Sequence, residues 1–529
     1  MKHMKPMKKM KRLLGVLLAA VMVLAMNITA LAADDTKYTI TINNINTGHK
    51  YEAYQVFAGD LSKGTLSNVK WGSGVDTSKT VGEKTLLQAL KDDSMLNTEF
   101  NTCSTAADVA DVLATFNDNS EKVDAFATVV SKYLSTPTGS ANEPTGGNYV
   151  ISNLPAGYYF VKDAQDLIGQ DAYTKFILKL VDNVSVTPKS AIPTVKKEVQ
   201  DEIADAESGN NEGWGATADH AINESFQFKL TATLAADTDY NAYETYKVIF
   251  NDTMSKGVTF ESIESVTVDG QSITNGNYNC TASSGQEGGK WTLTIDDIKA
   301  IVGVNLTDGA EIVVIYNAHL NEKATVNHES GSTENTNKVF LQYSNNPNVG
   351  GENDLGSTEE DMVWVFTYEV DNTKVNAADG MPLSGAGFRL YNADGSEEIS
   401  LIYDSTISAY RPIKYGELGV EMFSAEETGV FNIKGLDAGE YTLKETTVPG
   451  GFNKCADVKI KISATHKEEA GTGMTTLNSE STMTNRIENK QGATLPSTGG
   501  IGTTIFYVVG GILVIGAAVL LITRRRMNK

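Results

Sequence analysis

Short runs of alternating hydrophobic and polar residues recur along this chain, and each run predicts a β-strand. In the first third they span residues 38–45, 147–164 and 176–188. Two stretches, 105–116 and 123–134, instead place apolar residues at helical spacing, and the first opens with a pattern that resembles a capping box, Thr105 to Asp108. We interpret these stripes as helical core faces. A first domain over residues 34–192 should therefore combine strands with a helical excursion.

A second block of strand patterns begins at Pro193, and a third follows a polar linker. The second block predicts strands at residues 225–234, 245–250, 264–270, 291–296, 310–320 and 338–344. Short strands separated by Gly, Asn and Asp turns are typical of a β-sandwich, which we expect over 193–362 and again over 363–490. The fold class is therefore mainly β, with tandem β-sandwich domains. An acidic stretch at 201–212 lacks the regular oxygen ligands of a calcium loop, so we interpret it as a solvated insertion.

The two ends of the chain carry hydrophobic segments of different kinds. Six basic residues precede an apolar run over 13–26, and Ala30-Leu31-Ala32 offers a small-residue cleavage site, which together predict a signal peptide over 1–33. Near the other end an 18-residue uncharged run, 505–522, is just long enough to span a bilayer, and three arginines follow it. We expect a transmembrane helix and a cytoplasmic basic tail within 501–529.

The net charge limits the kinds of molecule that this chain is expected to bind. The chain has 44 Lys and Arg against 66 Asp and Glu, a formal net charge of −22. Six basic residues leave with the leader and four with the tail, so 34 remain against 66 acids and the mature portion is near −32. Such an acidic surface argues against nucleic acid or an anionic membrane as a partner.

The cysteines are sparse for an extracellular protein. Cys103, Cys280 and Cys455 fall one in each expected domain, so no domain can close a disulfide of its own. We interpret all three as buried hydrophobic thiols. Each domain is therefore either cross-linked by another kind of covalent bond or not cross-linked at all.

In the third domain, polar side chains stand on the apolar side of predicted strands. By strand alternation, Glu445 lies on the same strand face as Tyr441 and Leu443. In the same way, Lys374 lies on the face of the apolar residues that precede it, and Asn489 lies on the face of Ile487. An unpaired ionised carboxylate on such a face is expensive, so Glu445 should take up a proton or have a partner.

Two segments of this domain, 382–395 and 429–452, resemble Cna B-type immunoglobulin-like domains, and the second resembles the E-box of sortase-assembled pilins. In that family a buried Glu promotes a spontaneous amide bond between a Lys on the first strand and an Asn on the last. The resemblance gives these roles to Glu445, Lys374 and Asn489, with Asn485 as the runner-up acceptor. The competing interpretation is a lysine that reaches water and a salt-bridged glutamate.

The second domain offers a parallel set. Lys197 shares a strand face with Val195 and Val199, which leaves Lys196 to solvent. Asp252 ends an apolar row that includes Tyr246, Val248 and Phe250, while Asn337 runs in register with Val339, Leu341 and Tyr343. The set resembles the middle domain of shaft pilins, in which Lys, Asp and Asn form the corresponding link. Glu224 and Asn335 are the alternatives for the acid and the amide.

Two further motifs concern linkage between chains. Residues 491–500 contain the sequence LPSTGG, which resembles the cell-wall sorting signal of Gram-positive surface proteins and comprises Leu495, Pro496, Ser497, Thr498 and Gly499. In that family a sortase cuts between the Thr and the Gly, here Thr498 and Gly499. Lys189, next to Pro188 at the boundary of the first two domains, faces outward by strand parity and resembles the pilin-motif lysine, although the family usually has Tyr-Pro-Lys-Asn and this chain has Thr-Pro-Lys-Ser.

The mature chain as a whole resembles the backbone pilin of Gram-positive sortase-dependent pili. The resemblance implies a structural subunit whose Thr498 is joined to Lys189 of the next copy. Expected partners are a pilin-type sortase, identical subunits, ancillary pilins and, through a housekeeping sortase, peptidoglycan; a host ligand for adhesion stays unidentified. A monomeric wall-anchored adhesin and an ancillary pilin are the alternatives.

The sequence gives little support for an enzyme. No HExxH or GxSxG motif occurs, and of the six histidines only His319 and His328 lie close together. We interpret those two as turn or surface residues, and we expect no cofactor and no metal. The only chemistry expected of this chain is the autocatalytic formation of its internal amide bonds.

Overall fold

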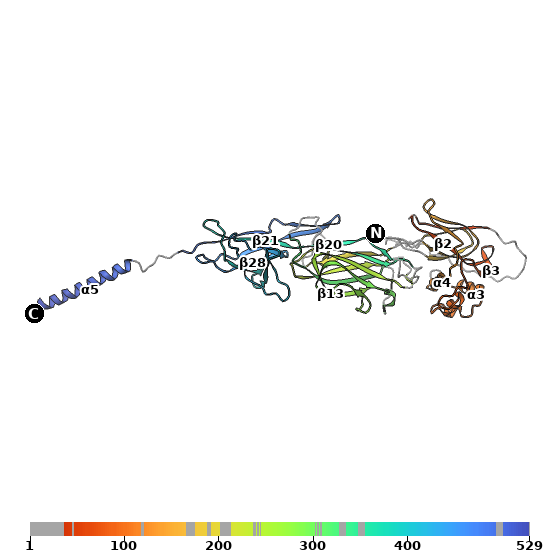
Figure 1. Cartoon of the computed structure of the whole chain (residues 1–529), viewed down its shortest axis with the longest axis horizontal. Coiled ribbons are helices and arrows are strands. Elements are labelled where there is room, and N and C mark those ends of the chain that lie inside the picture. Colours follow the sequence, from red (N-terminus) through yellow and green to blue (C-terminus); the bar gives the residue numbers. More distant parts are fainter. Residues whose placement is uncertain are drawn as a thin grey trace, which may run out of the picture. The chain divides into compact units, whose positions relative to one another are not determined.

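The structure is a computed structural model that describes residues 36–44, 47–117, 121–164, 175–187, 192–201, 213–235, 240, 243, 245–301, 303, 306, 309–326, 335–346, 355–493 and 501–527. Strands dominate, as the alternation predicts (Figure 1). The chain divides into two compact units: unit 1 comprises residues up to Tyr368 with 435–438 and 463–479, and unit 2 comprises 369–434, 439–462 and the rest from 480 onward.

The N-terminal part of unit 1 is built around β2 (Tyr51–Ser62), whose first seven residues are buried on both faces. One face of β2 packs against a three-stranded sheet in the order β5-β1-β8, and the other packs against four helices. The remaining strands are β1 (Tyr38–Ile42), β3 (Thr65–Trp71), β4 (Gly139–Ala141), β5 (Tyr149–Leu154), β6 (Gly157–Asp163), β7 (Lys175–Leu180) and β8 (Val184–Val186).

The helical excursion lies where its periodicity predicts it. The helices are α1 (Leu86–Asp92), α2 (Asn97–Phe100), α3 (Ala106–Leu113) and α4 (Glu121–Ser131). The capping box at the start of α3 is present, because the Thr105 side chain accepts from the backbone of Asp108 and the Asp108 carboxylate accepts from the backbone of Thr105. Cys103 is buried in the core that these helices share with β2.

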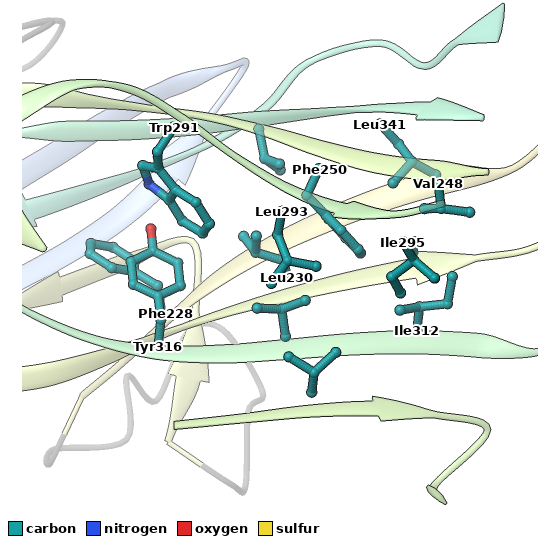
Figure 2. Close-up of a cluster of buried hydrophobic side chains, with 14 of the residues drawn as sticks. Phe228, Leu230, Val248, Phe250, Trp291, Leu293, Ile295, Ile312, Tyr316 and Leu341 are labelled. Atoms are coloured by element: carbon teal, nitrogen blue, oxygen red, sulfur yellow. The ribbon is translucent and has the colours of Figure 1, made fainter. Parts of the chain in front are cut away.

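The middle part of unit 1 is one large sheet whose main path is β10-β9-β12-β17-β13-β18-β20-β11. Its strands are β9 (Thr194–Gln200), β10 (Trp214–Gly215), β11 (Thr217–Asp219), β12 (Ser225–Thr233), β13 (Val248–Val268), β14 (Gln271–Ser272), β15 (Asn279–Cys280), β16 (Gln286–Ile295), β17 (Glu311–Leu320), β18 (Thr336–Ser344), β19 (Leu355–Ser357) and β20 (Asp361–Phe366). The sheet encloses a core of aromatic and aliphatic side chains (Figure 2).

One strand prediction in this part is wrong. The runs 245–250 and 264–270, expected as two strands, both overlap the single strand β13 (Val248–Val268), which is 21 residues long. The polar stretch between them resembles a turn in sequence, but the structure absorbs it as a break in pairing register between Met254 and Thr259. The first half of β13 pairs with β16 and β18, and its second half pairs with β17.

Unit 2 contains two five-stranded sheets, one in the order β24-β25-β27-β21-β32 and the other β23-β22-β28-β29 with β26 beside β22. The strands are β21 (Tyr368–Asn376), β22 (Gly387–Asn392), β23 (Glu398–Ile399), β24 (Leu401–Asp404), β25 (Ala409–Pro412), β26 (Met422–Phe423), β27 (Ile433–Leu436), β28 (Gly439–Thr447), β29 (Val458–Ile462) and β32 (Thr484–Asn489). Strands β21 and β32 pair in parallel. The hairpin of β30 (Ala464–Glu469) and β31 (Thr472–Leu477) belongs to unit 1.

The C-terminal helix α5 (Ile501–Met527) contains the expected apolar run and ends in the three arginines. Residues 502–527 form a helix long enough and apolar enough to cross a membrane, and its most apolar 18-residue window has a mean hydropathy of 2.8.

Three minor expectations need correction. Cys280 and Cys455 are free but only partly buried, unlike Cys103. His319 is partly exposed, as expected of a surface residue, but it lies in β17 rather than in a turn, with its ring 2.6 Å from the Glu261 carboxylate, and His328 lies outside the described residues. Asp201, the one residue of the acidic stretch that the structure describes, is buried, with His466 3.0 Å away, and residues 202–212 lie outside the described part. Alternation alone could not indicate these pairings, since both partners come from distant strands.

Candidate functional site: two buried lysine–acid–asparagine groups

The core of unit 1 brings together Lys197 from β9, Asp252 from β13 and Asn337 from β18. All three side chains are buried. The Lys197 Nζ forms an ion pair with Asp252 Oδ2 and donates a 3.0 Å hydrogen bond to the Tyr316 hydroxyl. That hydroxyl in turn donates to Asp252 Oδ2 at 3.2 Å and accepts a hydrogen bond from the Asn337 amide. Tyr316 therefore connects the amine, the acid and the amide.

Aromatic rings surround the lysine amine. The Lys197 Nζ lies 5.1 Å from the ring centre of Phe228 and 5.2 Å from that of Tyr316. Figure 2 shows these two rings together with Trp291 at one end of the core, apart from the aliphatic side chains. The rings exclude water from the amine, so its hydrogen-bond partners are protein groups.

Burial favours the neutral forms of both members of the ion pair. It lowers the pKa of Lys197 and raises the pKa of Asp252, although each group opposes the shift in the other. Among the described residues, Asp252 Oδ1 and Asn337 Oδ1 have no hydrogen-bond partner. Buried acceptors without a partner are uncommon in folded proteins, and the ion pair on Asp252 Oδ2 leaves these two oxygens unsatisfied.

The strands that carry the lysine and the asparagine are not hydrogen-bonded neighbours. Strand β9 pairs with β10 and β12, while β18 pairs with β13, β19 and β20. The backbone N–H of Lys197 donates to the Asp361 carboxylate of β20 at 2.6 Å. A bond from Lys197 to Asn337 would therefore join two strands that are not paired with each other directly.

Unit 2 holds a second group of the same composition. The Lys374 Nζ donates to Asn489 Oδ1 at 2.6 Å, and Asn489 Nδ2 donates to Glu445 Oε1 at 2.7 Å. The Lys374 Nζ is 3.8 Å from Glu445 Oε1. The three residues come from β21, β32 and β28, and none exposes more than 1% of its surface.

Packing holds this second group in place. Burial lowers the pKa of Lys374. The other Glu445 oxygen, Oε2, accepts the backbone N–H of Cys455 at 2.8 Å, which fixes the orientation of the carboxyl group. Because β21 and β32 pair in parallel with Asn376 opposite Asn489, the lysine two residues earlier lies beside the end of the last strand.

The alternative residues make other contacts. The Asn485 side chain donates to Asn372 at 3.0 Å. In the middle part Glu224 accepts the backbone N–H of Ala221, and Asn335 bonds both backbone groups of Thr325. Lys196 is exposed, as strand parity predicts.

The residues expected to link one chain to the next lie outside the described part of the structure. These are Lys189 and the sorting signal with Thr498 and Gly499. Just before Lys189, Val184 and Val186 of β8 are half-buried, and Ser185 and Thr187 are exposed. The prediction that Lys189 faces outward is based on this alternation, and it stays a prediction.

Comparison with known proteins finds two family models and a sequence relative that match this chain. A model described as a prealbumin-like fold domain (SpaA) matches residues 369–476, and one described as an LPXTG cell wall anchor motif matches 487–529. The trypsin-resistant surface T6 protein of Streptococcus pyogenes serotype M6 is 24% identical over 506 residues, which cover 91% of this chain and 81% of that protein.

Two solved structures are similar over most of the chain. The T6 backbone pilin of Streptococcus pyogenes serotype M6 is 17% identical, with a TM-score of 0.49, and covers 88% of this chain and 100% of its own. The major pilin SpaD of Corynebacterium diphtheriae is 17% identical, with a TM-score of 0.44, and covers 87% and 98%.

The chain resembles the major pilins of sortase-assembled pili. The anchor motif and the apolar helix support a surface protein attached to the cell wall, with a transient membrane stage. Within this pilin-like chain, Glu445 lies on β28 inside the matched prealbumin-like domain, and Lys374 lies on its first strand.

Sequence reasoning missed the role of Tyr316. Strand alternation in β17 places Ile312, Val314 and Tyr316 on the buried face, so the pattern could have shown an inward hydroxyl that needs a partner. It also missed Cys455, whose backbone N–H binds Glu445, because a backbone contact leaves no signal in the residue pattern.

Proposed function

We propose that this chain is the backbone subunit of a covalent surface pilus, stabilised by two internal Lys–Asn amide bonds and polymerised by a sortase. The observation that carries the proposal is the pair of buried lysine–acid–asparagine groups, one in each unit. The sequence relative T6 and the anchor motif support a pilus shaft subunit.

The internal reaction needs a neutral amine next to a polarised amide. Lys374 Nζ lies 2.6 Å from Asn489 Oδ1, and burial favours its neutral form. The amine attacks the Asn489 side-chain carbonyl carbon, and a new C–N bond forms. Glu445 relays a proton from the attacking nitrogen to the amide nitrogen, which leaves as ammonia. Lys197, Asp252 and Asn337 react in the same way, with the Tyr316 hydroxyl between them.

The linkage between chains follows the expectation for the family. A pilin-type sortase breaks the bond between Thr498 and Gly499 and holds the Thr498 acyl group. The Lys189 amine of another copy then takes that acyl group and releases the enzyme. The contact is head-to-tail and does not close on itself, which is the geometry that produces filaments. A housekeeping sortase would attach the finished fibre to peptidoglycan, and ancillary pilins and adhesion to host surfaces fit the same scheme.

Intact mass tests the internal bonds. The mature chain, residues 34–498, should weigh less than its sequence by two molecules of ammonia. Glu445→Gln and Asp252→Asn keep both reacting groups of their sites, and each should leave a deficit of one ammonia. A wild-type mass equal to the sequence would refute the bonds, and a deficit unchanged in both variants would refute the roles of the acids.

Immunoblotting of the cell-wall fraction tests polymerisation. Lys189→Ala should abolish the high-molecular-weight ladder and leave a wall-anchored monomer. Lys196→Ala is the matched control, because that lysine is exposed a few residues away and should leave the ladder intact. A ladder that persists in Lys189→Ala, or a wild-type chain that is only monomeric, would favour the wall-anchored adhesin instead.

A further inference from the structure

A cluster of metal-ligand residues lies in unit 1, outside the two lysine groups. It consists of His220, Glu224 and Asp437, whose ligand atoms all lie within 4.8 Å of one another. His220 follows β11, Glu224 precedes β12, and Asp437 belongs to the segment 435–438 of the same unit. Residues so distant in sequence converge here because the backbone N–H of Ile222 donates to the Gly435 carbonyl at 2.9 Å.

The His220 ring is fixed in the orientation of a metal ligand. Its Nε2 lies 2.7 Å from the backbone carbonyl of Gln200, which can only accept, so Nε2 carries the proton and Nδ1 keeps a free lone pair. The ring stacks on Phe226 with centres 4.1 Å apart, and the residue is 3% exposed. Nδ1 is buried without a hydrogen-bond partner among the described residues. Metal-binding histidines commonly donate their second N–H to a carbonyl in this way.

Carboxylates complete the set. Glu224 is half-buried, and its Oε2 accepts the backbone N–H of Ala221. Asp437 Oδ1 accepts the backbone N–H of Ala438, and its carboxyl group is hydrogen-bonded to Asp219. Two carboxyl groups therefore lie close to the buried Nδ1 of His220.

We infer that His220, Glu224 and Asp437 form a binding site for a divalent transition-metal ion of the Zn²⁺ class. One imidazole nitrogen and two carboxylate oxygens supply three ligands, which leaves a fourth position for water. Ligands of tetrahedral zinc lie about 3.4 Å apart, so the side chains need to close by little more than 1 Å. Calcium prefers six to eight oxygen ligands, and this set offers too few. The inference departs from the sequence expectation of no metal.

A neighbouring group provides an internal comparison. Asp201, Asp219 and His466 are also close together, but both nitrogens of His466 have partners: Nδ1 lies 2.9 Å from the Thr217 hydroxyl and Nε2 lies 3.0 Å from Asp201. That group is satisfied as an ion pair within the protein. The free nitrogen of His220 is what distinguishes the proposed metal site.

Calorimetric titration of the untagged mature chain with ZnCl₂ and with CaCl₂ tests the inference. We expect one Zn²⁺ per chain, a thermal midpoint that rises with ZnCl₂, and Ca²⁺ binding at least tenfold weaker. Glu224→Gln and His220→Gln should each weaken Zn²⁺ binding at least tenfold. His319→Gln is the control, because that histidine lies on another strand with Glu261 and should leave binding unchanged.

Two further measurements locate the metal. Nitrogen-15 NMR of the histidine rings should show Zn²⁺ on Nδ1 of His220, even if a variant folds poorly. His466→Gln should retain Zn²⁺ binding. Absence of Zn²⁺ binding, tighter binding of Ca²⁺, binding unaffected by Glu224→Gln, or loss of binding only in His466→Gln would each overturn the site. The amide bonds and the polymer ladder do not depend on this metal, so its failure would leave the proposed function standing.

Discussion

At the scale of the residue, the chemistry depends on what surrounds each lysine. Lys196 and Lys197 are adjacent, yet one amine is exposed and the other lies between two aromatic rings beside an acid. Removal from water shifts the buried lysine toward the neutral amine, whereas its neighbour keeps ordinary solvation. A strand turns alternate side chains to opposite faces, so one position in the sequence separates a buried amine from an exposed one.

Tyr316→Phe tests the bridging hydroxyl at this scale. Without it, Asn337 loses its hydrogen-bond partner and the acid loses a donor, so we expect the Lys197–Asn337 bond to form several-fold more slowly. Time-resolved intact mass after expression measures the rate. The Lys374–Asn489 bond in the same molecule serves as an internal standard. Tyr246→Phe, at another buried tyrosine of this core, is the control, and an equal delay in it would show a general packing effect.

At the scale of the element, short sequence patterns determine where a helix begins, whereas the neighbours of a strand are determined by long-range pairing in the sheet. The capping box of α3 is formed by residues three apart, so the sequence contains all of it. The 21-residue β13 is different, because its second half pairs with β17 across register shifts that no local pattern encodes.

Removing the side chain that caps α3 should destabilise that helix. Thr105→Ala leaves the Asp108 backbone N–H without its side-chain acceptor, which should destabilise the helical layer by about 1 kcal/mol. Hydrogen exchange of α3 amides measures the change locally. Thr98→Ala in α2 is the matched control, since the Thr98 hydroxyl contacts only the neighbouring Asn97 side chain and its loss should leave α3 unchanged.

The ion pair between Arg411 of β25 and Glu417 predicts acid sensitivity in unit 2. A hydrogen bond from Arg411 lowers the pKa of Glu417 from its ordinary value of 4.5 to about 2. A group with a depressed pKa in the folded state stabilises the fold above its unfolded pKa, and that stabilisation is lost as the pH falls. We therefore expect stability to fall between about pH 4.5 and pH 2, and less steeply in Glu417→Gln. Thermal melts across this range measure the slope, and identical slopes would contradict the assignment.

At the scale of the whole molecule, the two proposed bonds act on load and unfolding. Lys374 and Asn489 lie 115 positions apart, on first and last strands that pair in parallel. A covalent bond there carries force directly from one strand to the other and shields everything between them. Like a disulfide it also restricts the unfolded chain, by several kcal/mol, but without sensitivity to reductant. This fits a chain whose three cysteines are free.

Single-molecule pulling tests this shielding. The wild-type chain should show no extension from the segment between Lys374 and Asn489, whereas Glu445→Gln should release it as an added length of roughly 400 Å. Reductant should change neither trace. Release of the same length in the wild-type chain would show that the bond is absent under load.

The sequence by itself determined the mainly β fold, the capped helix, the inward parity of Lys197, Lys374, Glu445 and Asn489, and the anchor at the C-terminus. These depend on periodicities of a few residues or on composition, which a linear pattern contains. Only the tertiary structure decided which buried groups meet. Tyr316 between amine and amide, and Asp437 beside His220, bring together segments far apart in the chain, whereas Cys455 behind Glu445 and Glu224 near His220 are closer in sequence but are brought into contact by the fold. Their proximity depends on sheet register and strand order, which local alternation does not specify.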